Sequence, residues 1–323
     1  MYACLLPDTK SVLSFTENIT MADKVTILAN PAAAQPNRPF WDRMRGSDAW
    51  DWAQVVGRHL LLLPLTLMFI FPWFWMITTS IKSPEQILQF PPQWIPNPIS
   101  FRAYPEAFAD AQMLLYGRNT LFLCVVNVIG AVISNSLVAY GFSRIRWPGR
   151  EIVFIGVLAT MMLPYQVRMV PLYIIFSKMN WVNTYLPLIV PTYFASPFFI
   201  FMLRQFFRTI PDDLTDAARI DGASELRILW SIFIPLVKPA IAVIGLFEFI
   251  GNWNAFLEPL IYLNDTQLWT LTLGILGLRM QYGLSNYATI MAAICMALAP
   301  IVILFFLTQR TFIEGIALTG LKG

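Results

Sequence analysis

Long uncharged stretches recur along the chain and give the first indication of its architecture. A helix that crosses the hydrocarbon core of a bilayer needs about 20 mostly apolar residues, because each helical residue rises about 1.5 Å. Four stretches of about this length carry no charged side chain: residues 60–79, 120–142, 179–203 and 287–307. The pattern predicts that each of them is a membrane-spanning helix.

Two further apolar segments are interrupted by charge. Residues 152–170 include Arg168 near their end, and residues 239–263 contain Glu248 and Glu258. Charged groups are rare at membrane depth, and they occur where a helix faces a protein interior or a water-filled path. We therefore count both segments, which predicts an all-α polytopic membrane protein with six transmembrane helices.

Composition supports this interpretation and excludes an ordinary soluble domain. Of the 323 residues, 57% are hydrophobic and 13% are charged, whereas about a quarter of residues carry charge in soluble proteins. The mean hydropathy is +0.60. The 11 tryptophans and 25 phenylalanines suit a protein that anchors itself at two membrane interfaces.

Cofactor and metal chemistry find little support in the residues. Cys4, Cys124 and Cys295 show no C-x-x-C spacing, and His59 is the single histidine. No string has the glycine, lysine and serine or threonine order of a nucleotide-binding loop. We therefore expect no disulfide, no metal site and no cofactor bound by this chain, and we expect lipid rather than nucleic acid around it.

The distribution of lysine and arginine predicts the orientation. With the amino terminus in the cytoplasm, sixteen of the 22 basic residues fall in cytoplasmic segments. The six that remain outside are Lys82, Arg102, Arg118, Arg168, Lys178 and Arg279. Both termini are therefore expected in the cytoplasm of a cell whose plasma membrane holds the chain.

The first 58 residues differ from the rest of the chain. They contain no long apolar run and include the string NPAAAQPNRP, which predicts a partly disordered cytoplasmic leader over 1–58, with an interfacial helix near Trp50 and Trp52. The transmembrane domain then covers 59–323. The sequence leaves open whether Met1 or Met21 is the true start. Prolines predict an extended external loop over residues 82–118.

The inner loop over residues 204–238 carries orderly helix signals. Thr209 is a candidate cap, Pro211 suits a first helical turn, and two aspartates follow it. Gly222 suits a break in the backbone. The loop is predicted to form a short cytoplasmic helix, a tight glycine turn and a second helix that leads into the membrane.

Ala217 and Ala218 place two small side chains at the middle of that short helix, where a partner backbone has room to approach. Asp216, Arg219 and Asp221 supply charged edges around them. Composition alone favours an ordinary solvated amphipathic loop. The spacing of residues over the whole loop distinguishes a helix that binds a partner from a solvated loop.

This loop resembles the Glu-Ala-Ala signature of ATP-binding-cassette (ABC) importer permeases, in which Glu-Ala-Ala is followed by Gly and then by Ile-x-Leu-Pro. The matching positions are Asp216, Ala217, Ala218, Gly222, Ile232, Ile234 and Pro235. Asp replaces Glu at 216 and Ile replaces Leu at 234. Residues 161–173 and 201–211 and the closing TGLKG also look like the smaller permease of the maltose and glycerol-3-phosphate importers.

The resemblance implies a function and a set of partners. It implies a non-catalytic permease subunit in the bacterial inner membrane, with residues 204–238 as the loop whose helix seats in an ATPase. It further implies a second, different permease, a dimer of ATPase subunits that bind ATP and Mg²⁺, and an extracytoplasmic solute-binding protein. The solute implied is a sugar or related polyol, and the sequence does not select one.

Polar residues within the apolar segments are candidates for the translocation path. Glu248 and Asn252 are one turn apart, Asn254 stands to one side, and Asn127 lies in the second predicted helix. Helix packing explains such residues almost as well. Two other functions stay open on the residues alone, a membrane-embedded transferase and a secondary transporter.

Overall fold

A computed structural model describes residues 49–110, 112–283 and 286–320, with side chains over 55–110, 112–283 and 286–309. The elements in the described ranges are helices and turns. Contacts divide the chain into two units, Met1–Phe71 and Pro72–Gly323, and each is considered by itself. The predicted leader lies mostly outside the described residues, so its separation from the domain 59–323 stays a prediction.

The described part of the first unit belongs to helix α4 (Ala49–Ser80), which includes the predicted helix at Trp50 and Trp52. His59 Nδ1 lies 2.7 Å from the Val55 carbonyl, and the Thr66 hydroxyl donates to the Leu62 carbonyl at 2.8 Å. These bonds to the preceding turn satisfy polar side chains within the helix itself, as an apolar environment requires.

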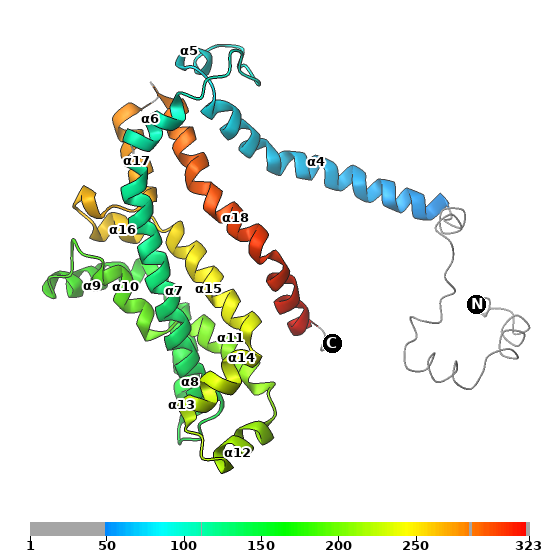
Figure 1. Cartoon of the computed structure of the whole chain (residues 1–323), viewed down its shortest axis with the longest axis vertical. Coiled ribbons are helices and arrows are strands. Elements are labelled where there is room, and N and C mark those ends of the chain that lie inside the picture. Colours follow the sequence, from blue (N-terminus) through cyan, green and yellow to red (C-terminus); the bar gives the residue numbers. More distant parts are fainter. Residues whose placement is uncertain (1–48, 111, 284–285, 321–323) are drawn as a thin grey trace, which may run out of the picture. The chain divides into compact units, whose positions relative to one another are not determined.

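The second unit is built on one long helix, α7 (Met113–Ser143), with α11, α15 and α17 packed along it (Figure 1). The remaining helices in chain order are α5 (Pro84–Ile87), α6 (Ala103–Asp110), α8 (Arg150–Ala159), α9 (Tyr165–Lys178), α10 (Leu186–Ile189), α11 (Pro197–Arg208), α12 (Asp212–Ile220), α13 (Glu225–Ile228), α14 (Ile234–Leu236), α15 (Lys238–Trp253), α16 (Leu257–Tyr262), α17 (Leu271–Tyr282) and α18 (Tyr287–Gly320).

Four helical stretches among the described residues are long and apolar enough to cross a membrane, and they confirm the four uncharged runs. They are Val55–Ser80, Met113–Ser143, Leu186–Arg208 and Tyr287–Gln309. Two helix pairs also pass if each is taken as one bent span: Arg150–Met162 with Tyr165–Lys178, bent by 99°, and Glu225–Leu236 with Lys238–Trp253, bent by 86°. The predicted number of six spans is therefore the upper limit of what the described residues allow.

Three predicted spans are not continuous helices. Residues 152–170 break at Pro164, since a proline keeps the residue before it out of helical geometry. Residues 179–203 become helical only at α10 and break again at Ala195, whose φ is +62°. The fifth predicted helix ends at Trp253, and α16 is a separate short helix. The predicted external loop was wrong in part, because it contains α5 and α6.

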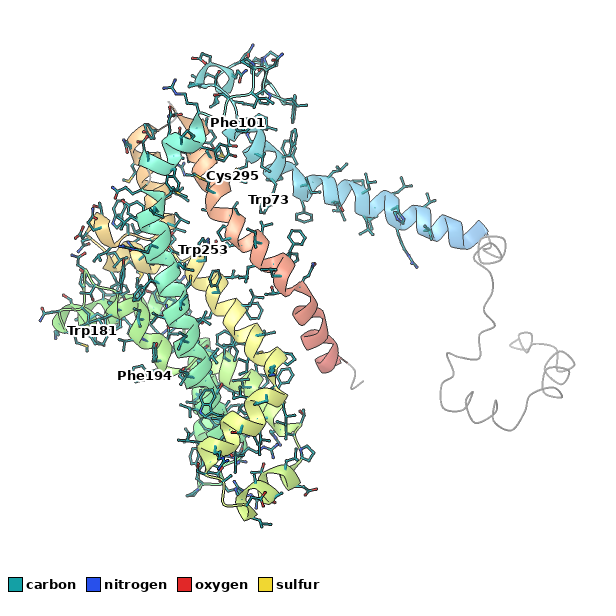
Figure 2. All side chains as sticks on the ribbon, in the orientation of Figure 1. Trp73, Phe101, Trp181, Phe194, Trp253 and Cys295 are labelled. Carbon is teal, nitrogen blue, oxygen red and sulfur yellow. The ribbon has the colours of Figure 1, made fainter. Side chains whose placement is uncertain are left out.

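Two buried apolar clusters hold the second unit together. One lies where α7, α11 and α15 meet and includes Tyr140, Phe207 and Phe233, whose rings pack edge to face at 5.2 to 6.4 Å. The other joins α6, α7, α17 and α18, and there Trp253 donates its indole N–H to the Ala297 carbonyl at 3.0 Å (Figure 2). Since lipid is as apolar as these side chains, close packing and hydrogen bonds stabilise such contacts more than burial does.

Arg204 connects three helices at the buried end of α11. Its guanidinium donates to both carboxylate oxygens of Glu151 on α8, at 2.6 and 2.7 Å, and to the Phe142 carbonyl of α7 at 3.1 Å. It also lies 4.0 Å from the centre of the Phe154 ring. Both carboxylate contacts come from Nη2, and this charge-assisted pair fixes the start of α8 against α7 and α11.

Glycine allows two close approaches between helices. A Cβ at Gly274 of α17 would stand 2.2 Å from the buried Tyr116 ring, and one at Gly130 of α7 would stand 2.5 Å from Tyr193. Small residues therefore set the distance between α7 and two of its neighbours.

Gly274→Ala should destabilise the chain, because the Tyr116 ring is buried and must shift to admit a methyl group. Overpacking of this kind costs about 1–3 kcal/mol, which predicts a thermal midpoint in detergent lower by several degrees. Gly156→Ala, at a helical glycine with open space, is the matched control. Equal midpoints for the two variants would contradict the packing described.

Candidate functional site

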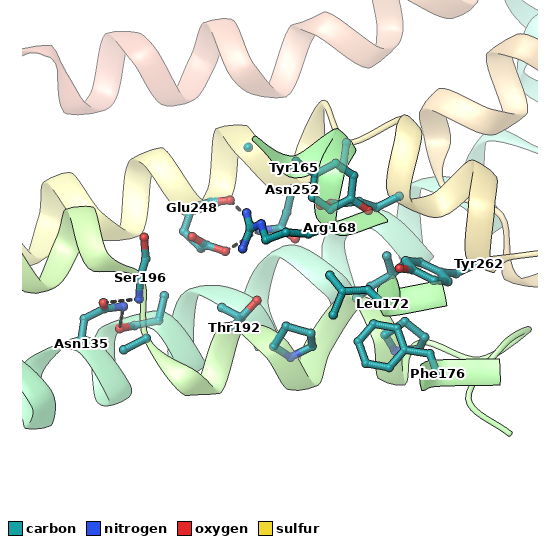
Figure 3. Close-up of a pocket in the computed structure, with 18 residues that line it drawn as sticks. Asn135, Tyr165, Arg168, Leu172, Phe176, Thr192, Ser196, Glu248, Asn252 and Tyr262 are labelled. Atoms are coloured by element: carbon teal, nitrogen blue, oxygen red, sulfur yellow. Dashed lines mark hydrogen bonds between the residues drawn. The ribbon is translucent and has the colours of Figure 1, made fainter. Parts of the chain in front are cut away.

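A polar cavity of about 440 Å³ opens inside the second unit, between α7, α9, α15 and α16 (Figure 3). Each of the three breaks in the predicted spans borders it, because Tyr165, Ala195 and Ala255 all line its wall. Non-helical backbone at membrane depth is tolerated where it lines a cavity or is buried in protein. The interruptions are therefore part of how the cavity is built.

A chain of hydrogen bonds joins α7 to the wall of the cavity. Asn127 of α7 is fully buried and donates its amide to the Leu188 carbonyl at 3.0 Å and to Asn252 Oδ1 at 2.5 Å. Asn252 in turn donates to Glu248, at 2.9 Å both to the carbonyl and to Oε1. This chain fixes the Glu248 carboxylate at the cavity surface.

The opposite wall brings in residues that sequence reasoning did not single out as path residues. Arg168 extends from α9 into the cavity, which Tyr165 and Glu258 also line (Figure 3). The Phe176 and Tyr262 rings add an aromatic corner with centroids 5.6 Å apart. The sequence showed Arg168 only as a charge near the end of an apolar segment and as a basic residue of the outer side, and its position after Pro164 was the available signal.

Two of the four predicted path residues line this cavity, and two do not. Glu248 and Asn252 lie on its wall. Asn127 stands behind the wall and holds Asn252. Asn254 follows the last residue of α15 and donates to the Ile250 carbonyl at 2.9 Å, so the helix end turns it away from Glu248.

Three other polar residues of α7 bond to neighbouring segments, and one of them, Asn135, also lines the cavity (Figure 3). Thr120 accepts from the Leu271 N–H at 2.8 Å, and Ser134 donates to the Thr192 carbonyl at 3.2 Å. Asn135 accepts from the Ser196 N–H at 2.7 Å, just before α11 begins. These bonds satisfy backbone groups left free by the helix breaks.

The inner loop forms a second candidate site. It folds into α12, a turn at Gly222 with φ +79°, and α13, in the order expected from the sequence. Asp212 and Asp213 occupy the first turn of α12. The expected cap was wrong: Thr209 ends α11 and bonds back to the Phe206 carbonyl, while Pro211 precedes α12. Ser224 caps α13 by accepting the Arg227 N–H at 3.4 Å.

Charged side chains tie this loop to the end of α7. The Tyr140 hydroxyl donates to Glu225 Oε2 at 2.6 Å, and Arg219 donates to Glu225 Oε1 at 2.8 Å and to Asp216 at 3.3 Å. The bond to Glu225 raises the pKa of the Arg219 guanidinium above its ordinary value. The set spans the Gly222 turn and closes it.

Arg144, which follows α7, makes the second link. Its guanidinium donates to the carbonyls of Phe207 and Ile210 and pairs with Asp212, and it lies 4.9 Å from the Phe233 ring centre. The side chain is 6% exposed, and burial lowers its pKa more than Asp212 raises it. Arg144 thus satisfies one carbonyl at the end of α11 and one just after it, and it holds the first residue of α12.

The outer side of α12 is apolar and small at its centre. Leu214 is 45% exposed and Ile220 is 87% exposed, and the exposed Ala217 lies between them. Ala218 and Ile232 instead pack against the buried cluster, and Asp221, Gly222 and Pro235 are exposed. The two alanines therefore face in different directions, which the sequence did not predict.

Among the described residues, no group of three or more histidine, cysteine, aspartate or glutamate side chains is placed to hold a metal ion. The chemistry available at the cavity is hydrogen bonding and charge: carboxylates that accept, a guanidinium that donates, and rings that pack against apolar ligand faces.

Comparison with known proteins gives three consistent likenesses. The family model described as "Binding-protein-dependent transport system inner membrane component" matches residues 127–316, which include both candidate sites. The arabinooligosaccharides transport system permease protein of Halalkalibacterium halodurans is 32% identical over 284 residues, 87% of this chain and 100% of that protein. The sn-glycerol-3-phosphate transport system permease protein of Yersinia enterocolitica is 30% identical over 267 residues, 80% of this chain and 94% of that protein.

A solved structure shares the fold. A chain from the crystal structure of a bacterial ABC transporter involved in the import of the acidic polysaccharide alginate superposes with a TM-score of 0.71 at 24% identity. The match covers 85% of this chain and 99% of that one. The arrangement of broken and continuous helices around α7 is therefore a known one.

Proposed function

Because the chain belongs to the family of inner membrane components of binding-protein-dependent transport systems, we propose that it is the permease subunit through which an ABC importer carries a sugar or related polyol solute. It is a transport component rather than an enzyme, and this sets aside the transferase and the secondary transporter. The solute class rests on relatives named for arabinooligosaccharides and glycerol 3-phosphate.

The cavity is the observation that carries the proposal for the path. Carboxylates at Glu248 and Glu258, the Arg168 guanidinium and the Tyr165 ring converge on one space from different helices. Sugars present hydroxyls that donate and accept hydrogen bonds and flat apolar faces that pack on aromatic rings, so this set of groups suits them. In this proposal Asn252 and Asn127 position Glu248, and Asn254 acts only from the edge.

The α12 segment is proposed as the coupling helix. Its apolar outer side, with Ala217 between Leu214 and Ile220, suits a groove on an ATPase subunit, while Asp216, Arg219 and Asp221 are placed to contact the rim. Importers of this family work with further subunits. We propose a second, different permease, an ATPase dimer that binds ATP and Mg²⁺, and a solute-binding protein outside the membrane.

The proposed topology places both termini and α12 in the cytoplasm. It follows from the bias of lysine and arginine toward the inner segments, and the coupling role requires it because ATP is hydrolysed inside the cell. Asp110 and Asp265 then belong to the outer side.

Glu248→Gln should impair transport without affecting assembly, because it keeps the shape of the side chain and removes the charge that faces the cavity. Losing one charge-assisted hydrogen bond lowers uptake by about 10- to 100-fold. Uptake of labelled arabinooligosaccharides and glycerol 3-phosphate by cells that express the full importer is the measurement. Glu85→Gln, an exposed carboxylate in α5, is the control. Parental uptake in the Glu248 variant would remove this residue from the path.

Ala217→Trp and Gly222→Val should release the ATPase for two different reasons. The first adds bulk to the exposed side of α12, and the second places a branched residue at φ +79° where open space surrounds the glycine, so its effect is backbone strain. ATPase recovered with the permease from detergent is expected to fall roughly tenfold, given about 1–3 kcal/mol of strain.

Ala217→Ser, which keeps a small side chain, is the matched control for the first variant. Membrane levels of each permease variant should equal the parental level, since the apolar spans are untouched. Full ATPase recovery and full solute-stimulated hydrolysis in both Ala217→Trp and Gly222→Val would refute the coupling role.

A further inference from the structure

A second cavity, of about 350 Å³, lies between the connection at residues 144–149, the end of α11 and α12. Five arginines line it, and two aspartates offset only part of their charge. The arginines are Arg144, Arg146, Arg150, Arg208 and Arg219. Arg144 and Arg146 follow α7, Arg150 is the first residue of α8, Arg208 is the last residue of α11, and Arg219 lies in α12. The ends of the membrane helices α7, α8 and α11 therefore bring positive charge into one space.

Ion pairing within the described residues leaves part of this charge unsatisfied. Arg144, Arg150 and Arg219 pair with carboxylates, whereas no salt bridge in the described part of the chain involves Arg146 or Arg208. A concentration of guanidinium groups in a hollow favours an anion, because each planar fork binds an oxyanion through paired N–H bonds.

Buried polar atoms in the wall point to a ligand as well. Thr215 is 2% exposed, and its hydroxyl oxygen has no hydrogen-bond partner although it lines the cavity. Arg144 Nε is likewise buried without a partner. A buried hydroxyl or N–H without a partner costs about 1–3 kcal/mol, so oxygen atoms supplied from outside the chain would stabilise this wall.

An apolar hollow adjoins the basic cavity. It measures about 370 Å³, shares Arg146 and Arg150 with it, and adds Trp147, Gly149 and Ile152, the last 77% exposed. Glu151 also lines it, and its carboxylate is paired with Arg150 and Arg204. Tryptophan and arginine side by side at a helix end are typical of the level of lipid headgroups. A ligand that fits both hollows has an anionic head and an apolar tail.

We propose that these two hollows bind one anionic phospholipid, with its phosphate group among Arg146, Arg208 and Thr215 and an acyl chain along Trp147 and Ile152. Basic pockets at the cytoplasmic ends of membrane helices are a known way to hold such headgroups. A free phosphate shares the headgroup chemistry and makes no use of the apolar hollow. The bound lipid would brace α12 against α7 and α8 from the side that faces the membrane.

The test uses the full-length chain purified in a neutral detergent and titrated with phosphatidylglycerol or phosphatidylcholine, with bound lipids counted by native mass spectrometry. The double variant Arg146→Gln/Arg208→Gln should bind phosphatidylglycerol roughly 30-fold more weakly than the parental chain. Arg227→Gln removes an exposed charge of the same loop outside both hollows and should bind as the parent does.

Thr215→Val tests the same site with all arginines in place, so it guards against misfolding of the double variant, and it should weaken phosphatidylglycerol binding by about fivefold. Phosphatidylcholine should bind weakly to every variant. Millimolar inorganic phosphate should leave the bound lipid in place.

Three results would overturn the proposal. Parental phosphatidylglycerol binding in both the double variant and Thr215→Val would exclude the site. Displacement of the lipid by inorganic phosphate would assign the cavity to a free anion. Unchanged lipid binding in the double variant together with loss of the ATPase would assign the arginines to an acidic partner surface. None of these results depends on which solute the importer carries.

Discussion

The placement of Arg144 is the constraint on which the packing around α12 depends. A guanidinium that is nearly fully buried is strongly destabilising unless acceptors surround it, and here they come from the carbonyls of Phe207 and Ile210 and from Asp212. The acceptors lie at the end of α11, in the connection that follows it and at the first residue of α12. The end of α7 and the start of the proposed coupling helix are therefore held together, because one supplies the buried guanidinium and the other supplies part of the acceptors that it needs.

The same helix reaches the proposed translocation path. Asn127 lies in the middle of α7 and fixes Asn252 and through it Glu248, while Tyr140 near the end of α7 holds Glu225 across the Gly222 turn. If solute binding moves α7, the direct contacts of α7 would transmit that movement to α12. The helix breaks at Pro164, Ala195 and Ala255 leave room for the cavity on one side of this rod.

Sequence reasoning identified the features that depend on local chemistry. A helix surrounded by lipid needs a long uncharged run, so the four clear spans could be predicted directly from the sequence. Gly222 predicted a turn, because glycine readily adopts the positive φ that such a turn requires. The break near Ala255 carries no comparable local signal, whereas the break near Ala195 is followed by Pro197 at the start of α11. The Arg144 contacts join residues more than sixty positions apart, and Arg168 reaches the cavity because α9 bends by 99° from the helix before it. Such contacts follow from the tertiary fold, and neither composition nor periodicity encodes them.

The central claim is that the end of α7 fixes the position of α12, and a spin-label distance measurement tests it most directly. Labels at Gly141→Cys in α7 and Ile220→Cys in α12, in a chain whose native cysteines are replaced, report the separation of the two elements. We expect a narrow distance distribution in the otherwise parental chain and a broad one once Arg144→Gln and Tyr140→Phe are added. A distribution that stays equally narrow and centred at the same distance in the substituted chain would contradict it.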